Sequence, residues 1–169
     1  KAMAAGVPVI LLYSDMPDSG ALAYVGLDNF QCGVDTATEF LKRGGNSGKF
    51  GIVMNAGAAN TEDKKAGVLK GLEGTDWELV VQAEDRADTQ TSIEASKAML
   101  SAHPEITGIF GLDAAAGSGI GNAIEELGLE DKGMTIVVHD RQDITLEYVQ
   151  KGIIGATLEA KTAFIPYLA

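Results

Sequence analysis

The sequence predicts an α/β protein with three layers, in which a parallel sheet is covered by helices on both faces. Short apolar runs of strand length alternate along the chain with segments whose apolar residues recur at helical spacing. The runs are too uniformly apolar for strands with one solvated face, which is typical of parallel strands buried on both sides. The 169 residues, 46% of them hydrophobic, are enough for one domain with a core of its own.

The first predicted strand covers residues 7–13 and the first predicted helix follows Asp28, which can cap it. This helix ends at residues 42–45, where two basic residues precede two glycines. Between strand and helix, residues 14–23 are rich in Gly, Pro, Asp and Ser, which is compatible with a crossover between two lobes. The residues expected on the apolar face of the helix are Phe30, Val34, Ala37 and Leu41.

The rest of the chain predicts further strands separated by helices. The predicted strands are residues 50–54, 77–83, 106–112, 134–138 and 153–158. Two of the helices are expected to begin at about Thr61 and Thr91, a third ends at Gly128, and the last covers residues 144–151. The helix residues expected to be buried are Val68, Leu69, Leu72, Ile93, Met99, Leu100, Ile120, Ala123, Ile124 and Leu127.

The composition disfavours several classes of protein. With a net charge of −11 and a pI of about 4.5, the chain has no cluster of Lys and Arg to neutralise nucleic-acid phosphates. No apolar run reaches the length of a membrane span. The single cysteine, Cys32, is expected to be a small apolar core residue, and His103 a surface loop residue.

Motifs for catalysis and cofactors do not match their templates. The glycines of residues 117–121 lie within a predicted helix rather than at a turn between strand and helix, so packing explains them better than a dinucleotide. No nucleophile and base stand at a recognisable spacing. We therefore predict no enzyme activity, no cofactor and no metal.

Polar residues follow the predicted strands, and these residues meet at one edge of a parallel sheet. Carboxylates there can accept hydrogen bonds from the hydroxyl groups of a sugar. The alternative is that Asp15, Asp113 and Asp140 each cap a helix, a frequent role for Asp after a strand. The predicted ligand-binding residues are Ser14, Asp15, Asn60, Glu62, Thr89, Asp113, His139, Asp140 and Lys161.

Motifs along almost the whole chain resemble those of type I periplasmic sugar-binding proteins, the ribose-binding class of receptors of ABC transporters. The matching segments are residues 5–19 (AGVPVILLYSDMPDS), 24–33 (YVGLDNFQCG), 52–54 with the 57–60 loop, 87–88, 102–110 (AHPEITGIF), 112–113, 136–140 (IVVHD) and 151–158 (KGIIGATL). The resemblance implies two Rossmann-like lobes that close around a sugar or polyol, with an ABC transporter permease or a membrane sensor as partner. It also implies a periplasmic or extracytoplasmic location, with a membrane tether possible.

The resemblance implies three segments in this chain. Residues 1–27 would be the last strand of the N-terminal lobe plus a hinge crossover, residues 28–158 the C-terminal ligand-binding lobe, and residues 159–169 a return crossover or truncated helix. Most of the N-terminal lobe is then missing. The first and last residues look like helices cut short, which favours a piece of a longer protein.

The resemblance also implies roles for single residues. Asp140 matches a hydroxyl-binding Asp, Asp113 stands where the family often has Asn, and Asp15 or its neighbour Ser14 matches a sugar-binding position. Glu62 replaces an Arg of ribose receptors, and Ala160 a Gln, while His139 replaces an aromatic residue. These departures put ribose itself in doubt. The crowded carboxylates Asp15, Glu62, Asp113 and Asp140 would repel one another unless a cation, a polyol or protonation intervened.

Two alternatives share this scaffold. Lactose-repressor-like regulators have the same core, but they typically carry a Pro-rich turn after the final binding Asp, which the sequence after Asp140 lacks. An enzyme on the same type of sheet would depend on Asp113 or His139, since a fold does not determine a function. Both alternatives stay open on the sequence.

Overall fold

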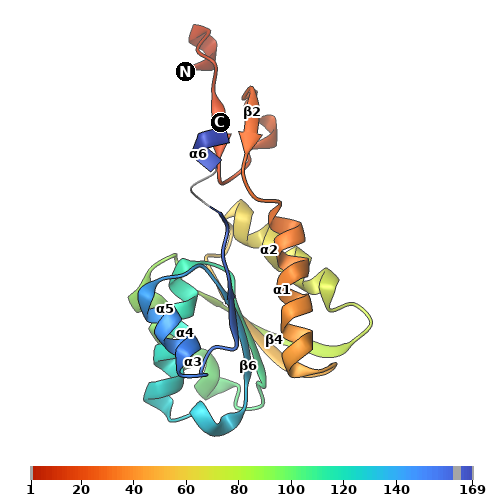
Figure 1. Cartoon of the computed structure of the whole chain (residues 1–169), viewed down its shortest axis with the longest axis vertical. Coiled ribbons are helices and arrows are strands. Elements are labelled where there is room, and N and C mark those ends of the chain that lie inside the picture. Colours follow the sequence, from red (N-terminus) through yellow and green to blue (C-terminus); the bar gives the residue numbers. More distant parts are fainter. Residues whose placement is uncertain (1, 162–164, 169) are drawn as a thin grey trace.

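The computed structural model describes residues 2–161 and 165–168. Most of the chain forms a lobe of sheet and helices, and residues 2–27 project from one end of it (Figure 1). The chain leaves β7 toward a single helical turn, α6 (Ile165–Leu168), which lies beside the projecting segment. Of the predicted final segment 159–169, residues 162–164 and 169 lie outside the described residues, as does residue 1.

The lobe is built on a parallel five-stranded sheet with the order β4-β3-β5-β6-β7. Its strands are β3 (Ser47–Met54), β4 (Asp76–Glu84), β5 (Gly108–Gly111), β6 (Thr135–His139) and β7 (Ala156–Leu158). From β3 the chain moves outward to β4 and then crosses to the other side for β5. The direction of winding therefore reverses between β3 and β5, where sheets of this type hold their ligands beyond the carboxyl ends of the strands.

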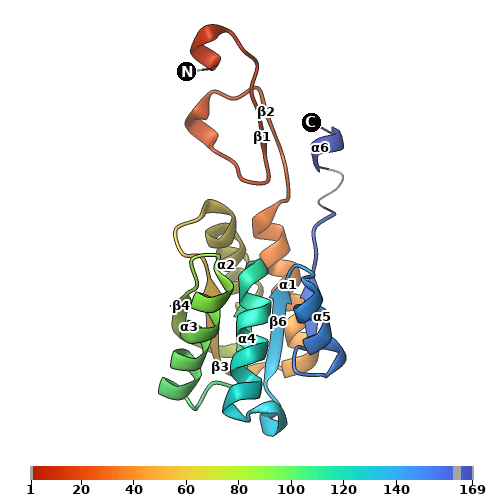
Figure 2. The same cartoon turned by 90° about the vertical axis from the view of Figure 1, so that its left-hand side faces the viewer.

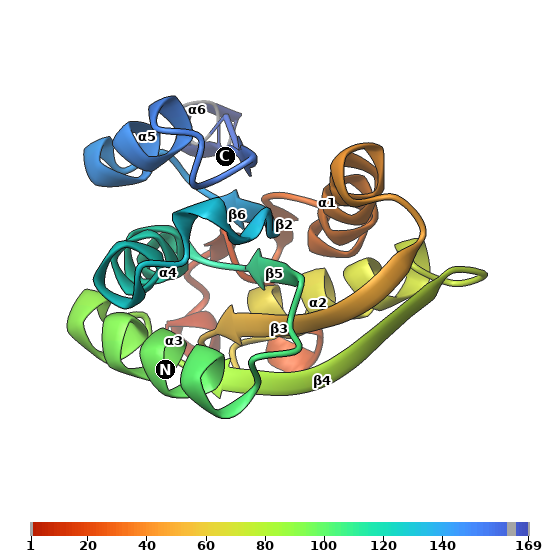
Figure 3. The same ribbon diagram turned by 90° about the horizontal axis from the view of Figure 1, so that it is seen from below.

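Helices cover both faces of the sheet, which confirms the predicted fold class (Figure 3). One face carries α1 (Asn29–Gly44) and α2 (Ala59–Gly71). The other carries α3 (Thr89–Ala102), α4 (Ala114–Leu127) and α5 (Asp143–Gln150). The side of α1 and α2 has an aromatic core, in which the ring centroids of Phe40 and Phe110 are 4.3 Å apart. The opposite side is filled mainly by aliphatic residues of α3, α4 and the sheet.

Glycines set how closely the helices approach. A Cβ on Gly33 of α1 would lie 2.0 Å from the carbonyl oxygen of Lys64, and one on Gly67 of α2 would lie 2.0 Å from that of Phe30. In α4, a Cβ on Gly119 would collide with Ser92, and one on Gly121 with Tyr148. The glycines of residues 117–121 lie inside α4 and pack against other helices, as predicted.

The projecting segment contains β1 (Ile10–Leu12) and β2 (Ala23–Val25), which pair in parallel, and two short 3-10 helices, Met3–Ala5 and Pro17–Ser19 (Figure 2). The strand β2 was not predicted, because three residues give no periodicity to detect. The hydroxyl group of Tyr24 in β2 donates to the carbonyl oxygens of Tyr13 and Leu27, at 3.1 Å each. Among the described residues of this segment, none is buried.

Several predicted boundaries and core positions differ from the structure. The helices α2 and α3 begin two residues earlier than expected, β5 is shorter than residues 106–112, and β7 begins at Ala156 rather than at residue 153. Leu69 and Phe30 are 39% and 45% exposed, although both were expected on apolar faces. The buried residues of α1 include Gly33, Ala37 and Phe40, whereas Phe30, on the same side of the helix as Ala37, lies in its first turn and is left exposed.

Candidate functional site

The carboxyl edge of the sheet faces the projecting N-terminal segment, because the chain runs from the end of β7 toward α6 beside β2 (Figure 1). Non-glycine residues with left-handed backbone conformations gather directly after the strands. Tyr13 follows β1, Arg86 and Ala87 follow β4, and Asp140 follows β6, with φ between 54° and 67°. Such conformations cost free energy and tend to cluster at functional sites.

Asp113 connects two elements at the point where the winding of the sheet reverses, namely the start of α4 and the loop after β3. It follows β5, and its Oδ1 accepts hydrogen bonds of 3.1 Å from the backbone N–H groups of Ala115 and Ala116, which caps α4. Its Oδ2 accepts a 2.8 Å hydrogen bond from the N–H of Asn55, directly after β3. Asp113 therefore caps a helix and also lies at the carboxyl edge of the sheet, so the two roles considered for it do not exclude each other.

Asp140 follows the neighbouring strand β6 and caps no helix, since α5 is preceded by Gln142. Its N–H donates to the carbonyl oxygen of Leu158 at 2.8 Å, and its own carbonyl accepts from the hydroxyl of Thr157. Burial raises the pKa of its carboxyl group, Lys64 opposes this, and Asp113 and Glu159 add to the rise. Asp140 therefore lies within electrostatic reach of Asp113, as the strand-end pattern predicted.

Lys64 is the cation at this edge that the sequence analysis missed. It lies on the sheet-facing side of α2, is 8% exposed, and donates from Nζ to the carbonyl oxygen of Leu112 at 3.1 Å. Its charge acts on Asp140, His139 and Cys32. The signal was present in the sequence, because a lysine among the buried positions of a helix requires a partner.

His139 lies beneath the edge and is 3% exposed. Its Nε2 is 3.0 Å from the hydroxyl of Thr36, and its Nδ1 is 3.9 Å from Sγ of Cys32. Burial, and to a lesser extent the charge of Lys64, lowers the pKa of His139 to about 3, so the ring is neutral. Cys32 is half-buried rather than part of the core, and burial raises the pKa of its thiol.

Asp85 was not among the predicted site residues, although it follows β4. Its side chain is completely buried. Oδ1 accepts a 2.9 Å hydrogen bond from the N–H of Ala87, whereas Oδ2 meets no hydrogen-bond donor among the described residues. Burial, together with the nearby Asp113, raises the pKa of Asp85 to about 7. The sequence carried no signal for this burial, since an aspartate in a loop after a strand is usually exposed.

Glu62 is directed to the loop between β3 and α2. Its Oε1 accepts a 3.0 Å hydrogen bond from the N–H of Gly57, and its Oε2 is paired with Lys65 at 3.3 Å. These two contacts, the first above all, lower the pKa of its carboxyl group. Glu62 therefore holds the loop beside the site, and its charge is compensated locally.

The other predicted residues lie on several elements around the carboxyl edge of the sheet. Asn60 and Thr89 lie in the first turns of α2 and α3, half-buried and exposed respectively. Ser14 and Asp15 are exposed in the projecting segment, where Oδ1 of Asp15 accepts a 2.8 Å hydrogen bond from the N–H of Met16. Lys161 is exposed beyond β7. The structure thus gathers Asp113, His139 and Asp140, and leaves these others more open.

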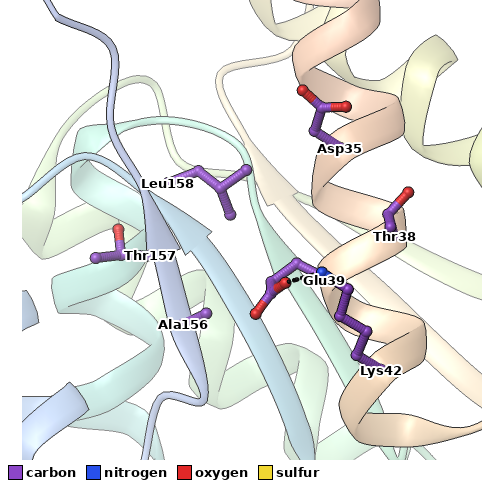
Figure 4. Close-up of a pocket in the computed structure, with 7 residues that line it drawn as sticks. All are labelled: Asp35, Thr38, Glu39, Lys42, Ala156, Thr157 and Leu158. Atoms are coloured by element: carbon purple, nitrogen blue, oxygen red, sulfur yellow. Dashed lines mark hydrogen bonds and ion pairs between the residues drawn. The ribbon is translucent and has the colours of Figure 1, made fainter.

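Two hollows lie between α1 and the edge strand β7. One of about 360 Å³ is bordered by α1 and β7 themselves (Figure 4). Its lining residues are Asp35, Thr38, Glu39, Lys42, Ala156, Thr157 and Leu158. The second, of about 490 Å³, reaches the carboxyl edge and includes Cys32, Glu159 and Lys161. Within the described residues, no group of His, Cys, Asp and Glu has the arrangement of a metal site.

The fold and the motifs of the sequence agree with one family. The model of the "Periplasmic binding protein domain" family matches residues 1–164. The chain belongs to the periplasmic binding protein domain family. This confirms the family resemblance that the motifs predicted.

Two of the similar proteins are named with the sugar that they bind. The xylose/arabinose-binding protein XylF of Sulfolobus acidocaldarius is 24% identical over an alignment of 187 positions, gaps included, that covers 99% of this chain and 46% of XylF. A solved structure of XylFII superposes with a TM-score of 0.93 at 28% identity, over 99% of this chain and 62% of XylFII. XylFII has also been solved in complex with LytSN.

A third relative was solved with its ligand. The ABC transporter periplasmic solute-binding protein of Actinobacillus succinogenes, with bound D-allose, is 26% identical and has a TM-score of 0.88. The match covers 99% of this chain and 62% of that protein. This chain thus spans about half to three-fifths of the length of these periplasmic binding proteins. XylF and the Actinobacillus succinogenes protein are named as binding proteins, and nothing in these relatives supports the regulator alternative.

No helix of the described residues has the length and apolar character needed to cross a membrane.

Proposed function

We propose that this chain is the ligand-binding lobe of a receptor that holds a sugar by hydrogen bonds at the carboxyl edge of its sheet. The observation that carries the proposal is the group of Asp113, Asp140 and Lys64 at this edge. Two carboxylates from neighbouring strands and one buried ammonium group provide acceptors and a donor. Sugar hydroxyl groups both donate and accept hydrogen bonds, so a polyol can satisfy both kinds of partner.

A sugar also fits the charge of the edge. Asp113 and Asp140 repel each other, and Lys64 compensates part of that repulsion. A neutral polyol that donates hydrogen bonds to both carboxylates adds no charge, whereas an anionic ligand would add to the repulsion. The sugars named for the relatives, xylose, arabinose and D-allose, are all neutral. The proposed ligand is therefore a neutral sugar or polyol, and the proposed role is binding without catalysis or a cofactor.

We propose further that a second lobe closes the site. Residues 28–158 would form the C-terminal lobe, residues 1–27 would contribute a strand of the N-terminal lobe and a hinge crossover, and residues 159–169 would return toward that lobe. Supporting this division, the relatives are longer than this chain, and strand β1 exposes the apolar side chains of Ile10 and Leu12. Closure of two lobes would exclude water from the sugar and present it to a partner. Ser14 and Asp15 would face the site from the N-terminal side.

The proposed partner is a membrane protein that recognises the closed receptor, either an ABC transporter permease or a sensor. The complex of XylFII with LytSN supports the sensor, and the similarity to proteins of sugar ABC transporters supports the permease. The corresponding location is periplasmic or extracytoplasmic, with or without a membrane tether. Nucleic acid is not a proposed partner, because the net charge of the chain is −11.

The proposal is tested by calorimetric titration of the full-length protein with a panel of neutral pentoses, hexoses and polyols. We expect one of these to bind, and Asp140→Ala to abolish the binding because it removes an acceptor at the edge. Asp143→Ala is the matched control, since Asp143 is exposed in the first turn of α5. Unchanged affinity in Asp140→Ala, or no binding of any of these compounds, would contradict the proposed function.

A further inference from the structure

The pair formed by Asp85 and Asp113 is not explained by the fold alone. Asp85 leaves β4 and Asp113 leaves β5, so the two residues stand on either side of β3 at the reversal of the sheet. Asp85 is completely buried, and its Oδ2 meets no donor among the described residues. Burying an ionised carboxylate oxygen without a donor costs free energy. A protonated carboxyl group avoids this cost, because it can donate a hydrogen bond to a partner that accepts one.

That partner is the carboxylate of Asp113. The backbone N–H of Asp85 donates to the carbonyl oxygen of Met54 at 3.1 Å, and Asp113 accepts from the N–H of the next residue, Asn55, so the two residues flank the end of β3. The charge of Asp113, and its capacity to accept a hydrogen bond from the neutral acid, both raise the pKa of Asp85 and favour its protonated form. Two carboxyl groups that share one proton form a strong hydrogen bond in which the neutral acid donates to the carboxylate. With Ala115, Ala116 and Asn55 already donating to Asp113, a fourth donor from Asp85 would leave its carboxylate little freedom to rotate.

We propose that Asp85 is a positioning residue, whose protonated carboxyl group donates a hydrogen bond to Asp113 and holds that carboxylate in the orientation that binds the sugar. The proposal rests on the proposed function of Asp113. Protonated Asp85 fixes Asp113, whereas ionised Asp85 repels it, so the affinity for sugar falls as the pH rises through the range in which Asp85 loses its proton.

The charged groups around Asp85 are few. Glu84 precedes it on β4 and adds to the repulsion, but its own carboxylate accepts from the N–H groups of Ala56 and Arg86. Arg86 and Asp88 in the same loop are exposed, and Asp88 caps α3. From α4 the facing group is Asp113 itself. Asp140 has the opposite effect on the affinity for sugar, because its ionisation with rising pH makes it a better acceptor. An increase in affinity with pH would therefore come from Asp140, and a decrease from Asp85.

The test compares two substitutions of Asp85 in the full-length protein, with D-xylose and L-arabinose as probes at pH 5.5 to 8.5. Wild type is expected to lose affinity about tenfold across this range, on the scale of a hydrogen bond to a charged group. Asp85→Asn keeps a donor at every pH, so its affinity is expected to vary much less. Asp85→Ala removes the donor and is expected to bind weakly throughout. A flat profile in wild type, or wild-type affinity in Asp85→Ala, would overturn the proposal.

A second measurement does not depend on the sugar. The carboxyl carbons of Asp85 and Asp113 are followed by NMR as the pH is raised, in wild type and in Asp113→Asn. We expect the midpoint for Asp85 to fall when Asp113 loses its charge, and an unchanged midpoint would show that the two do not share a proton. If neither sugar binds wild type but the midpoint does shift, the proposed function as a sugar receptor is contradicted. The proposed hydrogen bond between the two carboxyl groups is then still supported.

Discussion

The lobe of residues 28–158 and the projecting segment of residues 2–27 use their apolar residues in opposite ways. All buried hydrophobic residues in the described chain lie at Ala37 or later. Seven of its twelve exposed large hydrophobic residues lie in the projecting segment instead, namely Met3, Val7, Ile10, Leu12, Tyr13, Met16 and Leu22. The two regions are similarly rich in strand-forming residues, so composition does not explain the difference.

The difference shows that a strand needs neighbours before its side chains can be buried. In the lobe, β5 lies between two strands and under helices on both faces, and all four of its residues are buried. In the projecting segment, β1 has only β2 beside it and shows no buried residue. A pair of short strands cannot form a core of its own. The stability of the chain is therefore expected to reside in the lobe.

The largest effect on the free energy of unfolding is expected when a leucine of the lobe is replaced, and a leucine of the projecting segment is the comparison. Leu112→Ala should lower the free energy of unfolding by about 2–5 kcal/mol, because this side chain is completely buried and its loss leaves a cavity. Leu22→Ala should change it by no more than about 0.5 kcal/mol, because Leu22 is 74% exposed. Urea unfolding measures both. Similar losses for the two variants would mean that the projecting segment is as well packed as the lobe.

A smaller effect is expected from the cation at the sheet edge. Lys64→Met should cost about 1.5–3 kcal/mol at neutral pH, because it removes a buried charged donor and leaves Asp113 and Asp140 without compensation. The loss should diminish at acidic pH, where protonation of Asp140 relieves the repulsion. Lys65→Met is the matched control, since Lys65 pairs with the partly exposed Glu62 and should cost less than about 1 kcal/mol. Equal losses in the two variants would contradict a special role for Lys64.

The pH dependence of stability is expected to come from the lobe as well. The folded pKa of His139 is lowered to about 3, below its unfolded value, so stability falls as the pH decreases from about 6.5 toward 3. The folded pKa of Asp85 is raised to about 7, so its contribution is present below about pH 4 and is lost as the pH rises through 7. Between about pH 4 and 6.5 the two contributions oppose each other, so urea unfolding at a series of pH values should show little net slope from these two groups in wild type. His139→Gln should expose the loss of stability with rising pH that Asp85 causes. A pH profile unchanged in that variant would show that His139 does not contribute to it.

The smallest effect is expected within the projecting segment. Tyr24→Phe removes two hydrogen bonds to the carbonyl oxygens of Tyr13 and Leu27 and should weaken local order by about 1 kcal/mol. Global unfolding should change little, because the segment contributes no buried residues. Amide hydrogen exchange in residues 10–27 should therefore accelerate without a change in β3 or β5. Tyr167→Phe serves as a control, because Tyr167 is 84% exposed. Faster exchange in the lobe would show that the two regions unfold together.

The sequence predicted the order of strands and helices in the lobe but only part of its site. The spacing of apolar residues located α1 to α5, and the position after a strand singled out Asp113 and Asp140. The same reasoning overlooked Lys64, although it stands four residues before Val68 and therefore on the buried face of α2. It did not select Asp85, because a loop position does not indicate burial. It also placed Leu69 and Phe30 in the core, since periodicity neither separates Leu69 from its buried neighbour Val68 nor shows that the first turn of α1 is left uncovered.

By itself, the sequence determined the fold class, the family and the strand ends at which polar residues gather, because these depend on local patterns of hydrophobicity and on motifs. The tertiary structure alone decided how the carboxylates coexist. In the fold, Glu62 accepts from the N–H of Gly57, and Lys64 donates to the carbonyl of Leu112. Asp85 is buried near Asp113. Electrostatic energies depend on distance and burial across elements that are far apart in the chain, and no pattern of neighbouring residues encodes those quantities.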